Sequence, residues 1–187
     1  MSSLDCQARS AQSCRDCELA QTRRQAVFGS GPSQAGLIII GEAPGAHEDE
    51  GGAPFIGRSG RLLLGLLEEE LGLTRNDVYI ANTVKCRPPQ NRTPRMKEIE
   101  ACFPRLRTQV ETIAPSSILC VGATAQRALT GDRRPMRDAH GQVFDTHFGI
   151  RAVVTYHPAA ALRNGSRIVE AMRADLGVLG GLLGSQR

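Results

Sequence analysis

The sequence predicts an α/β domain in which parallel strands form a central sheet and helices cover both of its faces. Short apolar runs bounded by glycine alternate along the chain with longer amphipathic stretches, which is the order that right-handed crossovers between parallel strands require. The chain has 187 residues, of which 41% are hydrophobic and 22% charged, enough for one hydrophobic core. We therefore expect residues 1–187 to form one domain.

Four strands and four helices are expected after a polar N-terminal segment, residues 1–30, that reads as irregular. The predicted strands cover residues 35–41, 77–84, 116–122 and 151–158. The predicted helices cover residues 60–72, 93–115, 123–131 and 166–184. Ser59 is the expected N-cap of the first helix, and Pro104 is expected to kink or restart the second.

The composition bears on the partners and the cellular compartment that we expect for the protein. The net charge of +4 is compatible with a polyanionic partner without demanding one. No apolar run approaches the ~20 residues that a membrane-spanning helix needs. The first ten residues lack the apolar core of a signal peptide, so we expect a cytoplasmic protein without a membrane partner.

Three loops rich in polar side chains follow predicted strands. They read GEAPGAHEDEGGAPF after the first strand, NTVKCRPPQNR at the second and HPAAALRN after the fourth. In a parallel sheet the carboxyl ends of the strands share one edge, so these loops should converge on one crevice. The first loop is also far longer than the roughly 2–6 residues usual for such a connection, which indicates a functional loop.

Four of the six cysteines suggest a metal site, because disulfides are not expected in a reducing compartment. Cys14 and Cys17 form a CxxC pair; 68 residues then separate Cys17 from Cys86, and 15 separate Cys86 from Cys102. Such a set fits an iron–sulfur cluster or a structural zinc ion, and free thiols remain possible. The asymmetric spacing is unlike the paired CxxC motifs of a zinc ribbon and favours the cluster.

The remaining cysteines stay outside this set. Cys120 lies in an apolar strand and reads as an inert core thiol, and Cys6 has no informative spacing. Bound metal would attach the N-terminal segment to the loop at the second strand and to the helix after it. Its loss should therefore destabilise the fold.

Together these motifs resemble the family 4 uracil-DNA glycosylases. The resemblance covers roughly residues 14–175 and is carried by GEAPGAHEDEGGAPFIGRSG, NTVKCRPPQNRTP, YHPAAALRN and the four cysteines. It implies a three-layer α/β/α fold with a four-stranded parallel sheet and a [4Fe–4S] cluster on Cys14, Cys17, Cys86 and Cys102. It also implies base excision repair, in which uracil is flipped out of DNA and its N-glycosidic bond is hydrolysed to leave an abasic site.

The resemblance implies catalytic roles for Glu42, Asn82 and His157. Glu42 would orient water and stabilise the positive charge that develops on the sugar. Asn82 would read the Watson–Crick edge of uracil, because a carboxamide can donate and accept together. His157 would donate to the O2 atom of the departing base. The alternative readings are a capping acid, a turn former and a structural histidine.

The first loop would also shape the pocket for the base. The resemblance implies that Phe55 stacks on uracil and that Gly41, Ala43 and Gly45 bring the backbone close to it. Relatives elsewhere in the superfamily carry a bulky aromatic at the position of Gly45, so thymine must be excluded by other contacts here. Glu48 and Asp49 read more readily as a solvated pair or as braces of the loop.

Basic residues near these loops are expected to meet DNA. The resemblance implies that Arg163 and the amides around Ala159 hold phosphate, with Lys85 and Arg87 along the DNA path, unless they form only a solvated basic face. We expect a monomer acting on uracil in single- or double-stranded DNA. Asn91 stands about where a related branch carries the histidine that becomes trapped on DNA, so trapping is not expected.

Two other functions compete with this one. A non-catalytic iron–sulfur protein could bind damaged or single-stranded DNA without cleaving a bond. A nucleotide-processing hydrolase would need a phosphate-binding loop, and GSGPSQAG lacks the lysine of a P-loop.

Overall fold

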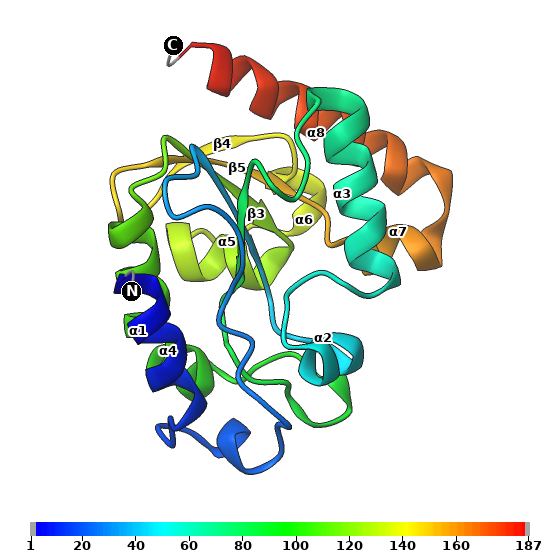
Figure 1. Cartoon of the computed structure of the whole chain (residues 1–187). Helices are drawn as coiled ribbons and strands as arrows, with labels where there is room; N and C mark the ends of the chain where they lie inside the picture. Colours follow the sequence, from blue (N-terminus) through cyan, green and yellow to red (C-terminus); the bar gives the residue numbers. More distant parts are fainter. Residues whose placement is uncertain (1–2, 186–187) are drawn as a thin grey trace.

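The computed structural model describes residues 3–185, which form a five-stranded sheet between two layers of helices (Figure 1). The strand order is β2-β1-β3-β5-β4, and the three pairings that do not involve β4 are parallel. The predicted three-layer α/β/α class is therefore confirmed. The strand count differs, because a short fifth strand extends one edge.

The strands are β1 (Leu37–Gly41), β2 (Tyr79–Asn82), β3 (Ser117–Val121), β4 (Val143–Asp145) and β5 (Arg151–Thr155). The α-helices are α1 (Ser3–Gln12), α2 (Ala46–Gly51), α3 (Arg58–Leu71), α4 (Met96–Ile113), α5 (Ala123–Thr130), α6 (Met136–Ala139), α7 (Pro158–Asn164) and α8 (Ser166–Gly184). Two 3₁₀ turns, η1 (Glu18–Gln21) and η2 (Pro89–Asn91), complete the elements. None of the helices in the described residues is long and apolar enough to cross a membrane.

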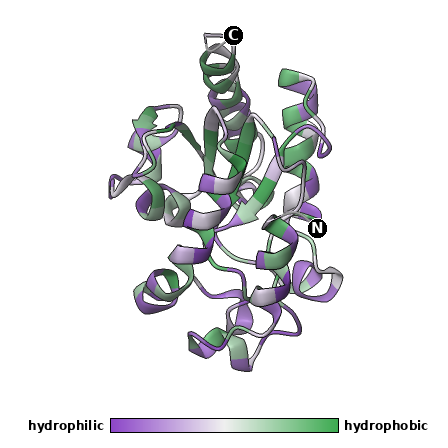
Figure 2. Cartoon of the chain, turned by 60° about the vertical axis from the view of Figure 1, so that its left-hand side comes forward, coloured by the Kyte–Doolittle hydropathy of each residue, from purple (hydrophilic) through white to green (hydrophobic). Residues whose placement is uncertain are grey.

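The side chains of each central strand alternate between two cores. Ile38 and Ile40 face one core with residues of α4 and α5, whereas Leu37 and Ile39 face the other with residues of α3 and α8. Figure 2 shows the apolar residues gathered on these strands in the middle of the molecule. Because both faces are covered, each strand reads as a continuous apolar run, which is why the sequence locates them well.

The N-terminal segment differs from the prediction of an irregular stretch, because it opens with α1. Leu4 and Ala11 of this helix are buried in the core on the α4 side, and α1 packs along α4 (Figure 1). An isolated helix of this length is marginal in water, so its stability comes from tertiary packing. Two small buried apolar residues are too weak a pattern to predict it.

The missed strand β4 pairs antiparallel with β5 at the edge of the sheet. Its three residues, Val143–Asp145, are exposed or half-buried and carry no apolar run. Edge strands are commonly short, which limits pairing with other chains. The pattern that identifies the buried strands is therefore absent here.

Helix boundaries differ at three points. Helix α3 begins after Gly57 instead of Ser59, and none of the described side chains caps its N-terminus. Helix α4 continues through Pro104 without a break. The predicted loop after His157 is mostly helical, as α7.

The strand order creates the crevice that holds the site. The chain runs from β1 outward to β2 and then returns to β3 on the other side of β1. The order of the strands therefore reverses at β1, and the loops that follow β1 and β3 leave the sheet in opposite directions. α/β folds commonly bind ligands in the crevice at such a switch point. The carboxyl ends of β1, β2, β3 and β5 all lie at this edge, so the three predicted loops start there.

Candidate active site

The carboxyl ends of β1 and β2 place Glu42 beside Asn82. Gly41 is the register partner of Asn82, and the Gly41 carbonyl accepts hydrogen bonds from both the amide and the hydroxyl of Thr83, each 2.8 Å long. The Val84 amide then donates to the Glu42 carbonyl (3.1 Å). These bonds continue the pairing beyond the strands and hold the two functional side chains at adjacent positions.

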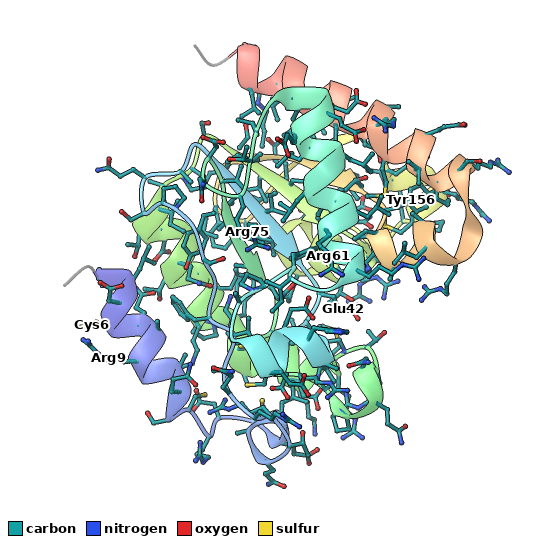
Figure 3. All side chains as sticks on the ribbon, turned by 45° about the vertical axis from the view of Figure 1, so that its right-hand side comes forward. Cys6, Arg9, Glu42, Arg61, Arg75 and Tyr156 are labelled. Carbon is teal, nitrogen blue, oxygen red and sulfur yellow. The ribbon has the colours of Figure 1, made fainter. Side chains whose placement is uncertain are left out.

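Glu42 is oriented by a residue that the sequence analysis missed. The hydroxyl of Thr124, at the start of α5, donates a short hydrogen bond to the Glu42 carboxylate. Figure 3 shows Glu42 close to α2 and to the Arg61 end of α3. A threonine directly after the third strand, in the segment GATAQ, lies at the same sheet edge as the other loops, which is the signal that could have identified it.

Asn82 is only 2% exposed, and its carboxamide makes no hydrogen bond with any of the described residues. Its polar atoms are nevertheless not among the fully buried ones without a partner in the described part of the chain, so they keep some access to solvent. The side chain is held closely: a Cβ atom on Gly41 would lie 2.5 Å from Asn82 Oδ1 and 2.7 Å from Phe55 Cζ. Gly41 therefore permits a close approach of Asn82 and Phe55 that any larger residue would obstruct.

Phe55 is buried and adopts a left-handed backbone conformation, with φ of 55°. Such a conformation is uncommon for a bulky residue and needs support from its surroundings. Arg75 supplies it by donating to the carbonyl oxygens of Pro54 and Phe55, both at 2.8 Å. Arg75 is half-buried, is labelled in Figure 3 and was not identified from the sequence, where it occurs in an ordinary turn.

His157 follows β5 and completes the group. Its ring centroid lies 6.4 Å from that of Phe55, and its Nδ1 atom accepts a hydrogen bond from the Ala159 amide (3.2 Å). Burial, and then the charge of Arg163, lower the pKa of His157 to about 4, although Glu48 acts in the opposite direction. The ring is therefore neutral at pH 7, and because Nδ1 is an acceptor, Nε2 carries the proton.

Glu48 and Asp49 brace the loop, in agreement with the reading preferred from the sequence. Glu48 lies in α2 and accepts hydrogen bonds from the amides of Gly45 (3.0 Å) and Gly57 (2.8 Å). Asp49 is buried and accepts a bond from the Arg24 amide (3.0 Å). A Cβ atom on Gly45 would approach the Glu48 carboxylate to 2.8 Å, so the position of Gly45 is filled by this brace.

Cys14, Cys17, Cys86 and Cys102 line a single pocket between the N-terminal segment, the loop after β2 and helix α4. The Arg23 guanidinium donates to Cys86 Sγ (2.8 Å), and the Lys85 amide donates to Cys102 Sγ (3.4 Å). Burial raises the pKa of the Cys86 thiol to about 11. Without metal the Cys86 thiol is therefore protonated at pH 7.

The four thiols are the candidate metal ligands of this pocket. Sulfur ligands of zinc lie about 2.3 Å from the ion and so close to one another. Within residues 3–185, no group of three or more His, Cys, Asp or Glu side chains is close enough to hold a single ion. Four thiols around one pocket, with hydrogen-bond donors to two of the sulfurs, are the ligand type that a thiolate-bound metal group takes.

Lys85 requires a correction, because it was expected to contact DNA. The side chain is 1% exposed and its ammonium donates to the carbonyl of Asn82 (2.8 Å), so it cannot reach a DNA backbone. Arg87 is half-buried and donates to Asn91 Oδ1 (2.7 Å). Arg163 and Ala159 lie on α7, where Arg163 is exposed beside the histidine loop.

The two remaining cysteines and one histidine lie outside the site. Cys120 is buried in β3, as expected, and Cys6 is exposed on α1 (Figure 3). His140 is half-buried and its Nδ1 lies 2.9 Å from Oδ1 of the buried Asp175. Thr155 donates to the other oxygen of this carboxylate (2.8 Å), which links α8 to the end of β5.

Comparison with known proteins identifies the family. Residues 28–176 match the model of the uracil DNA glycosylase superfamily. The type-4 uracil-DNA glycosylase of Saccharolobus solfataricus is 44% identical over 88% of this chain and 79% of its own length. The corresponding figures are 42%, 82% and 80% for the type-4 enzyme of Thermotoga maritima, and 30%, 78% and 71% for the type-5 enzyme of Pyrobaculum aerophilum. The chain belongs to the uracil-DNA glycosylase superfamily and, within it, to the type-4 uracil-DNA glycosylases.

Proposed function

We propose that this protein is a monofunctional uracil-DNA glycosylase of base excision repair, which hydrolyses the bond between uracil and deoxyribose. The observation that carries the proposal is the buried Asn82 carboxamide, which has no hydrogen-bond partner among the described residues and lies next to Gly41 and Phe55. The printed names of the relatives, type-4 uracil-DNA glycosylases, support the same activity.

Recognition of uracil follows from the chemistry of Asn82. Its carbonyl can accept from N3–H of the base while its amino group donates to O4. Cytosine presents the reversed pattern at these atoms and would leave both groups unsatisfied. Phe55, packed against Gly41, offers an aromatic face for a base that has been flipped out of the stack.

Bond cleavage needs stabilisation of opposite charges on the two products. The neutral imidazole of His157 can donate from Nε2 to O2 of the departing base, where negative charge grows. The Glu42 carboxylate can stabilise the positive charge on the sugar and orient the attacking water. The Thr124 hydroxyl holds one carboxylate oxygen and leaves the other available.

We also propose that Cys14, Cys17, Cys86 and Cys102 hold a [4Fe–4S] cluster. When bound, the cluster supplies a structural link instead of reaction chemistry, because its pocket joins the N-terminal segment to α4. The pocket that all four cysteines line supports this proposal.

The DNA partner would be held mainly by charge around α7. Arg163 is exposed one turn after the histidine loop and can contact a phosphate. The amides of Ala159 and Ala160, near which phosphate contacts were expected, donate instead to Nδ1 (3.2 Å) and the carbonyl (2.8 Å) of His157. Arg87 is a second candidate at the opposite loop. Every proposed site residue comes from one chain, so a monomer suffices for activity.

The test is incubation of the purified protein with an oligonucleotide that carries one uracil, followed by alkali and separation of the fragments. We expect strand cleavage at the uracil by the wild type and a loss of about 100-fold or more in Asn82→Ala. Asn76→Ala is the matched control, because Asn76 is exposed in the turn before β2. Gel-shift binding without cleavage by the wild type would instead support the non-catalytic DNA-binding alternative.

A further inference from the structure

Lys85 is a buried cation without a carboxylate partner. Its side chain is 1% exposed, and none of the ion pairs in the described part of the chain includes it. Its ammonium donates to the Asn82 carbonyl (2.8 Å) and lies 5.8 Å from the centre of the Phe28 ring. A buried charge is costly unless it is paired, so this position calls for a negative partner.

The residue type at this position is itself informative. Only two of the 23 Lys and Arg residues are lysines, and the other, Lys97, is exposed on α4. A guanidinium carries five donors in a rigid plane, whereas an ammonium is a compact point charge. The chain therefore departs from its strong preference for arginine where a small, fully buried cation is required.

The cysteine pocket supplies the missing negative charge. Lys85 lines this pocket together with all four cysteines, and its own backbone amide donates to Cys102 Sγ (3.4 Å). Thiolates that hold an iron–sulfur core leave a net negative charge, which a neighbouring cation stabilises.

We propose that Lys85 is a positioning residue that couples the cluster pocket to the base-reading Asn82, by neutralising the cluster thiolates at one side and holding the Asn82 carbonyl at the other. The inference rests on the proposed glycosylase function and on the proposed cluster. Lys85 and Asn82 are three residues apart, so movement of the ammonium changes the backbone that presents the carboxamide. Loss of the cluster would accordingly impair uracil recognition as well as stability.

The experiment compares Lys85→Met, Lys85→Arg and the surface control Lys97→Met with the wild type. Two quantities are measured: the rate at which ferricyanide bleaches the visible absorbance of the cluster, with iron and sulfide content as reference, and kcat and KM on a uracil-containing strand. For Lys85→Met we expect bleaching at least ~5-fold faster and kcat/KM at least ~10-fold lower, whereas Lys97→Met stays within ~2-fold in both. Lys85→Arg keeps the charge and should bleach more slowly than Lys85→Met.

Other results overturn the proposal. If Lys85→Met bleaches at the wild-type rate, Lys85 has no electrostatic role at the cluster. The same follows if Lys85→Arg bleaches as fast as Lys85→Met. Faster bleaching with unchanged kcat and KM removes the link to Asn82. If Lys85→Met does not fold, Lys85→Gln provides the uncharged comparison.

Failure of the glycosylase function has a different signature. A wild type that carries iron and sulfide but leaves uracil untouched contradicts the function, and the bleaching rates still test the electrostatic role. A wild type purified anaerobically without iron or sulfide overturns the inference directly.

Discussion

At the scale of single residues, the site depends on side chains held in one protonation state and one orientation. His157 is neutral because burial and Arg163 lower its pKa to about 4, and the Ala159 amide selects the tautomer that donates from Nε2. Glu42 has one oxygen occupied by Thr124. Donor and acceptor roles are therefore set before a substrate binds, which lowers the reorganisation that the reaction requires.

The state of His157 predicts the pH dependence of stability. The folded-state pKa lies below the unfolded value of 6.5, so the unfolded chain binds a proton first as the pH falls. The free energy of unfolding of the wild type should therefore decrease between pH 6.5 and 4, by at most about 3 kcal/mol from this group. Urea unfolding across this range should show a shallower slope in His157→Gln. An identical slope in the two proteins would contradict a buried neutral histidine.

The bond from Thr124 predicts a kinetic effect without a binding effect. Thr124→Val keeps the shape of the side chain but removes the donor to Glu42, so kcat on uracil-containing DNA should fall about 10-fold with little change in KM. Thr108→Val is the control, because Thr108 is exposed on α4 and donates only to the Pro104 carbonyl. A raised KM with unchanged kcat would mean that Thr124 serves substrate binding instead.

At the scale of elements, the carboxyl ends of β1 and β2 determine how closely the functional side chains approach. Gly41 is the last residue of β1 and has Asn82 Oδ1 and Phe55 Cζ within contact of the position that a Cβ atom would take. Gly65, in the middle of α3, has no heavy atom within 4 Å of that position. A methyl group therefore has room at Gly65 and none at Gly41.

Alanine substitutions at Gly41 and Gly65 should change the free energy of unfolding in opposite directions. Gly41→Ala forces Asn82 and Phe55 to move and should lower kcat/KM at least about 10-fold while destabilising the fold by ~1–3 kcal/mol. Gly65→Ala should stabilise α3 by up to ~1 kcal/mol without altering kinetics, because alanine favours helix over glycine. Thermal unfolding and steady-state kinetics on both variants check the pair. Normal activity in Gly41→Ala would show that the loop adapts easily.

At the scale of the whole molecule, the cysteine pocket joins parts of the chain that are distant in sequence. It brings the loop after α1 against the β2 loop and against α4, and a small apolar cluster that includes Leu19, Val84 and Ile99 surrounds it. The active-site edge of the sheet begins at the same β2 loop. Damage to the pocket therefore affects both the N-terminal segment and the position of Asn82.

Removing the cluster should loosen this junction. Because ligand binding stabilises the folded state, oxidative removal of iron or the substitution Cys102→Ser should lower the Tm by ~5 °C or more. Limited proteolysis should then cut first within residues 13–36, between α1 and β1. Cys120→Ser, in β3 away from the pocket, should leave iron content unchanged even if it lowers stability. Equal iron loss in both variants would argue against the proposed ligand set.

The amino-acid sequence by itself determined the sheet, its two helix layers and the edge at which the loops meet. Continuous apolar runs such as residues 35–41 occur where both faces of a strand are buried, and parallel strands must end at one edge. The positions of Glu42, Asn82 and His157 at strand ends follow from this local pattern. The family resemblance then supplied their expected roles.

Only the tertiary structure decided which neighbours those residues have. The hydrogen bond from Thr124 to Glu42 joins residues 82 positions apart, and the one from Arg75 to Phe55 joins residues 20 positions apart. The burial of Lys85 depends on other segments that cover it. The edge strand β4 and helix α1 likewise exist through pairing and packing. The local sequence pattern indicates on which face of an element a side chain lies. Whether that side chain is buried, and which partners it has, depends on how distant segments pack. This packing makes Lys85 an internal cation instead of a surface contact for DNA.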